Sequence, residues 1–187
     1  MRKQALKYRA AAVTNGDGTS NRNQTRNEAN MTDLERMAIE HACSKLVVAF
    51  YNRDDEFDHE AILRLFTEDA VWDHLVAGRL DGKSKIGAYL NSKNTNAIMK
   101  HMVTNIEIDV IDGNRAKGKS YYTFYASPTG AERPAELKGP MAVGHYDDEF
   151  VRTAGGWRFS RRSTSISFEA SHRGDYSLLA PDASKTR

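Results

Sequence analysis

The sequence of 187 residues contains a single cysteine, Cys43, so one chain can form no internal disulfide. This usage fits a reducing compartment, and Cys43 falls inside a predicted helix, where we expect a small core residue. No apolar run approaches the roughly 20 residues that a bilayer span requires. The basic N-terminus is not followed by the apolar segment of a secretory signal. We therefore expect a cytoplasmic protein.

The sequence also has little excess charge of either sign. A net charge of +2 is too small to favour nucleic acid or an anionic membrane as partner. No glycine-rich phosphate loop is present, and the histidines lack the spacing of metal ligands. These histidines are His41, His59, His74, His101, His145 and His172. We therefore expect neither a metal nor a cofactor.

What the sequence does contain is typical of one globular domain with polar ends. Hydrophobic residues make up 40% and charged residues 28%. Residues 1–30 are too polar to offset the entropy of ordering, and we expect a disordered extension. We expect the folded domain over 31–170 and a flexible tail over 171–187.

Helical patterns come first. A capping box of Thr32 and Glu35 begins a helix that we expect to end near Tyr51. Its apolar spacing predicts that Leu34, Ala38, Ala42, Leu46 and Ala49 form the buried face. Asp58 is a predicted N-cap for a second, short helix that reaches Phe66. We expect a third helix over 83–92 and a loop or turn over 77–82.

Strand patterns fill the second half of the domain. A short strand is predicted over 69–76. From His101 onward the apolar period becomes that of strands, and we expect long antiparallel strands joined by turns. Their expected ranges are 101–110, 116–127, 141–153 and 157–168. Helices followed by antiparallel strands indicate an α+β fold.

Four segments, in this order and spacing, resemble the SnoaL-like branch of the nuclear transport factor 2-like superfamily. They are "LFTEDAVWD" (65–73), "GRLDGKSKI" (78–86), "KHMVTN" (100–105) and "GHYDDEFVRTAGGWRFSRR" (144–162). The resemblance implies a cone-shaped barrel: a strongly bent, mostly antiparallel sheet with about three N-terminal helices. It also implies an apolar cavity for a small apolar substrate and a homodimer or homotrimer.

The resemblance extends to enzymes of this branch: scytalone dehydratase, bile acid dehydratase and hexachlorocyclohexane dehydrochlorinase. By that match His101 is a general base and Arg152 an anion stabiliser. The relatives' partner aspartate corresponds to Asn52, which can orient a ring but supplies no charge. Asp54 or Asp55 could replace it if the alignment slips.

Asp148 is another candidate partner, because Tyr146, Asp148, Phe150 and Arg152 share one face of a regular strand. We expect Tyr146 and Phe150 to line the substrate cavity with Tyr51, Trp72 and Tyr121. Alternation allows only one of Tyr121 and Tyr122 to face inward.

The residue types suit proton removal beside a leaving group. A histidine titrates near neutral pH, a carboxylate fixes its tautomer, and an arginine can hold a developing anion. The sequence thus favours a cofactor-independent lyase or isomerase. Two alternatives are a non-catalytic small-molecule binder and the small structural subunit of a ring-hydroxylating dioxygenase. These three residues also have a purely structural interpretation. In it, His101 is a histidine at the end of a strand, Arg152 is a charged residue near a turn, and Asn52 ends a helix.

Overall fold

The computed structural model describes residues 31–95, 97–128 and 134–170. The predicted disordered extension and C-terminal tail lie outside these residues. The helices are α2 (Asp33–Asp55), α3 (His59–Leu63) and α4 (Lys83–Ser92). The strands are β1 (Phe66–His74), β2 (Gly78–Asp81), β3 (Ala97–Asp112), β4 (Arg115–Pro128), β5 (Ala142–Thr153) and β6 (Gly156–Glu169).

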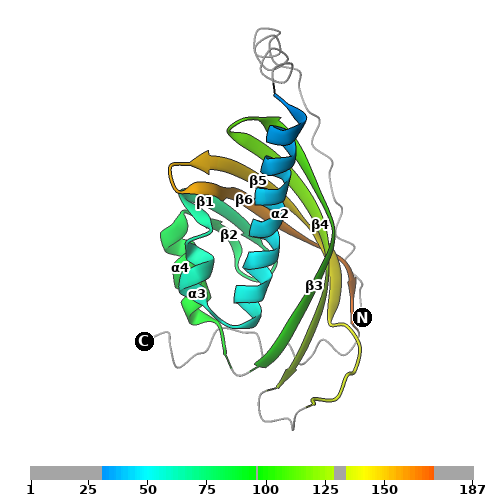
Figure 1. Ribbon diagram of the computed structural model, residues 1–187. Coiled ribbons are helices and arrows are strands. Elements are labelled where there is room, and N and C mark those ends of the chain that lie inside the picture. The colour runs from blue at the N-terminus through cyan, green and yellow to red at the C-terminus, as the bar shows by residue number, and fades with distance from the viewer. Residues whose placement is uncertain (1–30, 96, 129–133, 171–187) are drawn as a thin grey trace, which may run out of the picture.

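The six strands form one bent sheet with the order β2-β1-β6-β5-β4-β3. All neighbours are antiparallel except β1 and β6, which are parallel. The helices lie on the hollow side of the sheet, where α2 runs alongside β3 (Figure 1). The α+β prediction is confirmed, but the sheet is open rather than closed into a barrel, because β2 and β3 form its two edges.

The long helix α2 begins at the predicted capping box. The Glu35 N–H donates to the Thr32 hydroxyl at 3.2 Å, and the Thr32 N–H donates to the Glu35 carboxylate at 2.9 Å. The buried face lies one residue beyond the predicted one, and Leu34 is exposed. Larger side chains explain this rotation, because their burial removes more apolar surface from water than that of the alanines. The buried residues are Ile39, Cys43, Val47, Phe50, Tyr51 and Asp54.

Several predicted boundaries differ from the structure. The segment predicted as a loop contains β2, because Leu80 pairs with Trp72 in a hairpin. Positive φ values at Gly78 (72°) and Gly82 (85°) bend the chain at the two ends of this short strand. Phe66 begins β1 rather than ending a helix, and α2 continues to Asp55. Strand β3 begins at Ala97, so His101 lies inside the strand.

The core contains a fully buried charged pair among aromatic rings. Arg162 Nε lies 3.1 Å from Asp148 Oδ1, and Arg162 Nη2 donates to Asp148 Oδ2 at 3.2 Å. The guanidinium carbon also lies 4.2 Å from the ring centre of Phe50. Burial raises the pKa of Asp148 to about 6 although Arg162 opposes the shift. Cys43 is buried as expected, and burial raises the pKa of its thiol to about 12.

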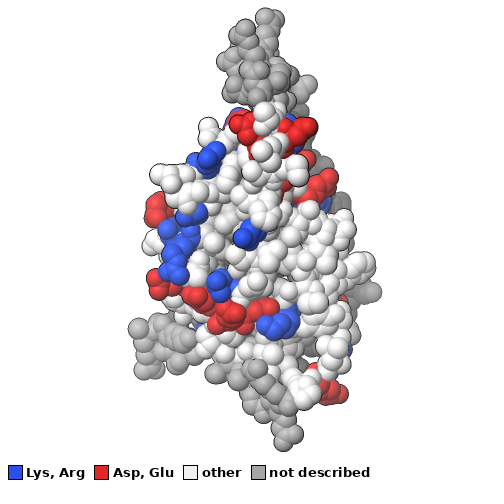
Figure 2. Space-filling view, in the orientation of Figure 1, with Lys and Arg blue, Asp and Glu red and all other residues white. Residues whose placement is uncertain are grey.

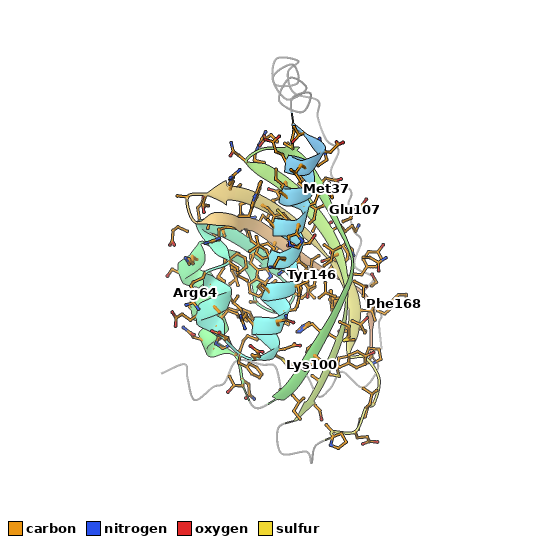
Figure 3. All side chains as sticks on the ribbon, viewed as in Figure 1. Met37, Arg64, Lys100, Glu107, Tyr146 and Phe168 are labelled. Atoms are coloured by element: carbon orange, nitrogen blue, oxygen red, sulfur yellow. The ribbon has the colours of Figure 1, made fainter. Side chains whose placement is uncertain are left out.

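The surface of the helical side mixes Lys and Arg with Asp and Glu, without a large area of one sign (Figure 2). Side chains divide clearly between inside and outside: Tyr146 points between the sheet and α2, whereas Phe168 projects from the end of β6 (Figure 3). In the described ranges, no helix is long and apolar enough to cross a membrane.

We predict that Asp148→Asn lowers the free energy of unfolding by about 3–5 kcal/mol, because it leaves the buried Arg162 without a counter-charge. Urea unfolding at pH 7 measures the change. The control is Asp147→Asn, at the exposed neighbouring position, which should change stability by less than about 0.5 kcal/mol. Equal stability of the two variants would contradict the prediction.

Candidate active site

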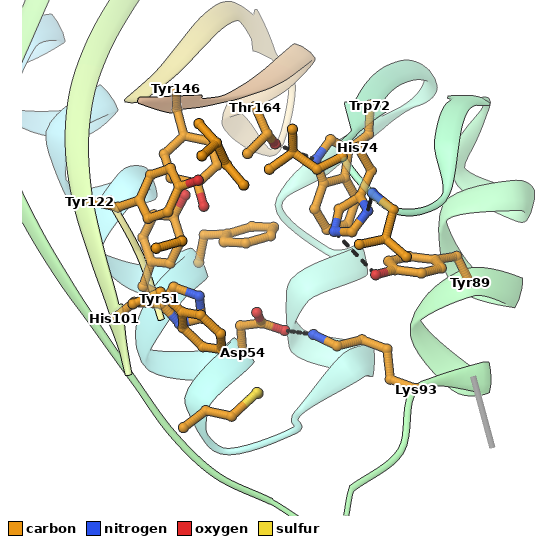
Figure 4. A pocket seen from close by; sticks show the side chains of 17 residues that line it. Tyr51, Asp54, Trp72, His74, Tyr89, Lys93, His101, Tyr122, Tyr146 and Thr164 are labelled. Carbon is orange, nitrogen blue, oxygen red and sulfur yellow. Dashed lines mark hydrogen bonds and ion pairs between the residues drawn. The ribbon is translucent and has the colours of Figure 1, made fainter. Parts of the chain in front are cut away.

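A pocket of about 110 Å³ lies between the C-terminal half of α2 and the hollow face of the sheet. This volume exceeds several-fold the roughly 10–15 Å³ that one water requires, so a small molecule can enter. Most of the lining is apolar or aromatic, contributed by α2, α4 and five strands (Figure 4). A few polar groups lie among these side chains, which is the usual composition of a small-molecule site.

His101 lies on one wall of the pocket, paired with a carboxylate. Its Nδ1 lies 2.7 Å from Asp55 Oδ1, and its backbone N–H donates to Asp55 Oδ2 at 3.1 Å. Both side chains are about nine-tenths buried, at 10% and 8% exposure. Because the ionised carboxylate only accepts, Nδ1 carries the proton and the lone pair is on Nε2.

The His101 ring is also held by packing. It stacks on Phe124 with ring centres 4.5 Å apart and meets Tyr51 at 5.1 Å. Lys100 Nζ approaches the outer side of Asp55 at 3.5 Å. Asp55 therefore has partners on two sides, and the orientation of the imidazole is fixed by the carboxylate and two rings.

A buried ion pair lines the pocket floor. Lys93 Nζ lies 2.5 Å from Asp54 Oδ1, and both side chains are 9% exposed. Burial acts to raise the pKa of Asp54, but Lys93 and then His101 oppose it, and the pKa ends below its ordinary value. Asp54 is therefore ionised at neutral pH, with the Lys93 side chain as its partner.

The wall facing His101 is formed by His74 and Tyr89, whose Nε2 and hydroxyl oxygen are 3.1 Å apart (Figure 4). Trp72 packs edge-on against His74, with ring centres 4.8 Å apart. The Trp72 indole N–H donates to the Thr164 hydroxyl at 3.4 Å. Burial, with a contribution from Lys93, lowers the pKa of His74 to about 4, so this histidine is neutral at physiological pH.

Three of the predicted cavity residues line this pocket: Tyr51, Trp72 and Tyr146. The other two do not. Tyr121 is 47% exposed on the outer face, and its neighbour Tyr122 takes the inward place that alternation allows for one of them. Phe150 is buried in the core beyond the pocket.

The predicted catalytic residues are only partly brought together. Asp55 reaches His101, whereas Asn52 is exposed on the outer side of α2. This follows from the rotated helix face, because Asn52 continues the predicted face three residues after Ala49. Asp148 has the predicted inward orientation but is paired with Arg162 and does not line the pocket.

Arg152 lies far from His101. It is exposed near the β5–β6 turn and lines a separate open groove beside the start of α2. Residues of one parity share a face, but six residues along a strand separate Arg152 from Tyr146 by about 20 Å. Alternation along a strand thus predicts on which face of the sheet a residue lies, but not how far along the strand it lies from the pocket.

Sequence reasoning did not single out His74, Tyr89 or Lys93. Alternation could have found His74, because it has the same parity as Trp72 in a predicted strand. No comparable signal marks Tyr89 or Lys93, which come from α4 and the residue after it. Among the described residues, no group of three or more His, Cys, Asp or Glu is arranged to hold a metal ion.

The buried neutral His74 predicts a pH dependence of stability. Unfolding restores an ordinary pKa near 6.5, so between pH 6.5 and 4 the unfolded chain binds the extra proton. The contribution of His74 to stability should therefore fall as the pH falls across this window, by up to about 3 kcal/mol, whereas Asp148, whose pKa is raised by burial, contributes in the opposite direction. Urea unfolding should show that His74→Gln loses stability toward pH 4 less steeply than the wild type, whereas the control His145→Gln, at a site outside the pocket, should keep the wild-type slope. An unchanged slope in His74→Gln would contradict the assignment.

Comparisons with known proteins agree with this architecture. The structure is similar to that of a Novosphingobium aromaticivorans protein described as a candidate scytalone dehydratase, with a TM-score of 0.63 and 20% identity over 75% of this chain and 91% of that one. It is also similar to a hexachlorocyclohexane dehydrochlorinase of Novosphingobium barchaimii, with a TM-score of 0.61 and 16% identity over 74% and 93%. At such identities these likenesses show the fold alone.

Sequence comparisons identify the family as well as the fold. The uncharacterized protein Rv2910c of Mycobacterium tuberculosis is 31% identical over 127 residues, which are 67% of this chain and 83% of that protein. The Mycobacterium bovis protein Mb2934c matches to the same extent. The model of the SnoaL-like domain matches residues 35–163. With its fold and its helix-covered pocket, the chain therefore belongs to the SnoaL-like domain family.

Proposed function

We propose that the protein is a cofactor-independent lyase or isomerase that removes a proton from carbon in a small apolar cyclic substrate, with His101 as general base. The observation that carries the proposal is the Asp55–His101 hydrogen bond of 2.7 Å on the wall of an apolar pocket. A base of this kind needs a lone pair held in a fixed direction, and an imidazole hydrogen-bonded to a carboxylate supplies it.

The reaction follows from the ring's orientation. His101 Nε2 accepts the proton, and the electrons of the C–H bond form a carbon–carbon double bond. In an elimination the leaving group departs from the adjacent carbon with its electron pair. In an isomerisation the existing double bond shifts, and the proton returns at another carbon. Asp55 holds the tautomer and stabilises the imidazolium during either reaction.

The aromatic lining supports an uncharged, compact substrate. Tyr51 and Tyr146 present their rings to the pocket, and the buried Arg162 lies behind them, 4.9 and 4.6 Å from their ring centres. Burial raises the pKa of both phenols, so they remain protonated and do not compete with His101 as bases.

We predict that His101→Ala lowers the rate of carbon-proton removal by about 10²–10⁴-fold, because the positioned base is lost. Asp55→Asn should lower the same rate by at least about tenfold while the substrate still binds. The assay follows loss of carbon-bound hydrogen in D₂O by NMR, over a panel of hydroxylated, halogenated and carbonyl-bearing cyclic compounds.

His145→Ala is the matched control, because His145 also lies beside an aspartate, Asp147, but outside the pocket. It should retain full activity. Equal exchange by wild type and His101→Ala would remove His101 from the reaction. Binding of the panel without any exchange would instead identify a non-catalytic binding protein.

A further inference from the structure

The wall opposite His101 contains a chain of hydrogen bonds with a fixed direction. The backbone N–H groups of Val76 and Ala77 both donate to Nδ1 of His74, at 3.1 Å each. A ring nitrogen that accepts these bonds cannot carry a proton, so the single proton of the neutral imidazole is on Nε2. Burial keeps the ring neutral by lowering its pKa to about 4.

This tautomer determines what Tyr89 can do. The His74 Nε2–H group donates to the Tyr89 oxygen, 3.1 Å away. The hydroxyl hydrogen of Tyr89 must therefore point away from His74. Within the described part of the chain, that hydrogen has no acceptor, and Tyr89 lines the pocket. Burial and the nearby Asp54 raise the pKa of Tyr89, so the hydroxyl keeps its proton.

From this geometry we infer that Tyr89 is a substrate-binding residue that donates a hydrogen bond to a carbonyl oxygen, with His74 as its positioning residue. The inference rests on the proposed function and names its substrate class: an uncharged cyclic ketone with an acidic C–H bond. When His101 removes that proton, the electrons of the C–H bond form the enolate and negative charge develops on oxygen. A preorganised donor at that oxygen stabilises the charge.

The other polar groups of the pocket favour an uncharged ligand. The Lys93 ammonium, the only cation of a lysine or arginine among the described lining residues, is engaged by Asp54 at 2.5 Å. A carboxylate or phosphate would have to compete with this buried pair. A ketone needs only one donor, and Tyr89 supplies it from the side of the pocket that faces His101 (Figure 4).

The test compares cyclic ketones with two matched sets of compounds, in which a methylene group or a chlorine-bearing carbon replaces the carbonyl group. Calorimetry measures affinity, and the infrared band of a ¹³C-labelled carbonyl measures the hydrogen bond. Wild type should prefer each bound ketone over its counterparts, with the band shifted to lower frequency. Tyr89→Phe should bind ketones about threefold to tenfold more weakly, as expected for one hydrogen bond, and the band should return toward that of the unbonded carbonyl.

Tyr121→Phe, on the outer face, is the matched control and should retain both properties. His74→Phe keeps a ring but removes the donor, and its carbonyl band should shift only part of the way. An unshifted band in wild type, a band unchanged by Tyr89→Phe, or no preference for ketones in wild type would overturn the assignment. Hydrogen exchange in D₂O reports His101 separately: ketone preference without exchange would refute the proposed reaction and leave the Tyr89 site intact.

Discussion

The pocket depends on the contact between the last turn of α2 and strand β3. Asp55 accepts hydrogen bonds from both the ring and the backbone N–H of His101. These two bonds fix the helix end and the imidazole relative to each other. Because Tyr51 and Asp54 belong to the same turn, their positions in the pocket follow from that contact.

Neighbouring carboxylates at a helix C-terminus are electrostatically unfavourable, since the helix dipole is negative there. The structure compensates by giving each carboxylate its own partner: Lys93 for Asp54 and His101 for Asp55. Burial makes these partners necessary, because an unpaired buried charge is costly. The result is a pocket that contains ionised groups but has little net charge to offer a ligand.

The sequence predicted the order of the helices and of every strand except β2, the inward face of most of β5 and the aromatic character of the lining, because each depends on local periodicity. It could not decide among Asn52, Asp54 and Asp55, since a rotation of α2 by one residue exchanges which of them faces inward. It also misplaced Arg152, because alternation carries no information on distance along a strand. Tyr89 and His74 meet only through the packing of α4 on β1, which no local pattern encodes.

Asp55 has one more consequence, for association between chains. β3 is an edge of the sheet, and an edge N–H without a partner can recruit a strand from another molecule. At His101 that N–H is already satisfied by a side chain of the same chain. Asp55 thus also occupies one backbone donor of the edge strand β3, which is then not free to pair with a strand of another molecule.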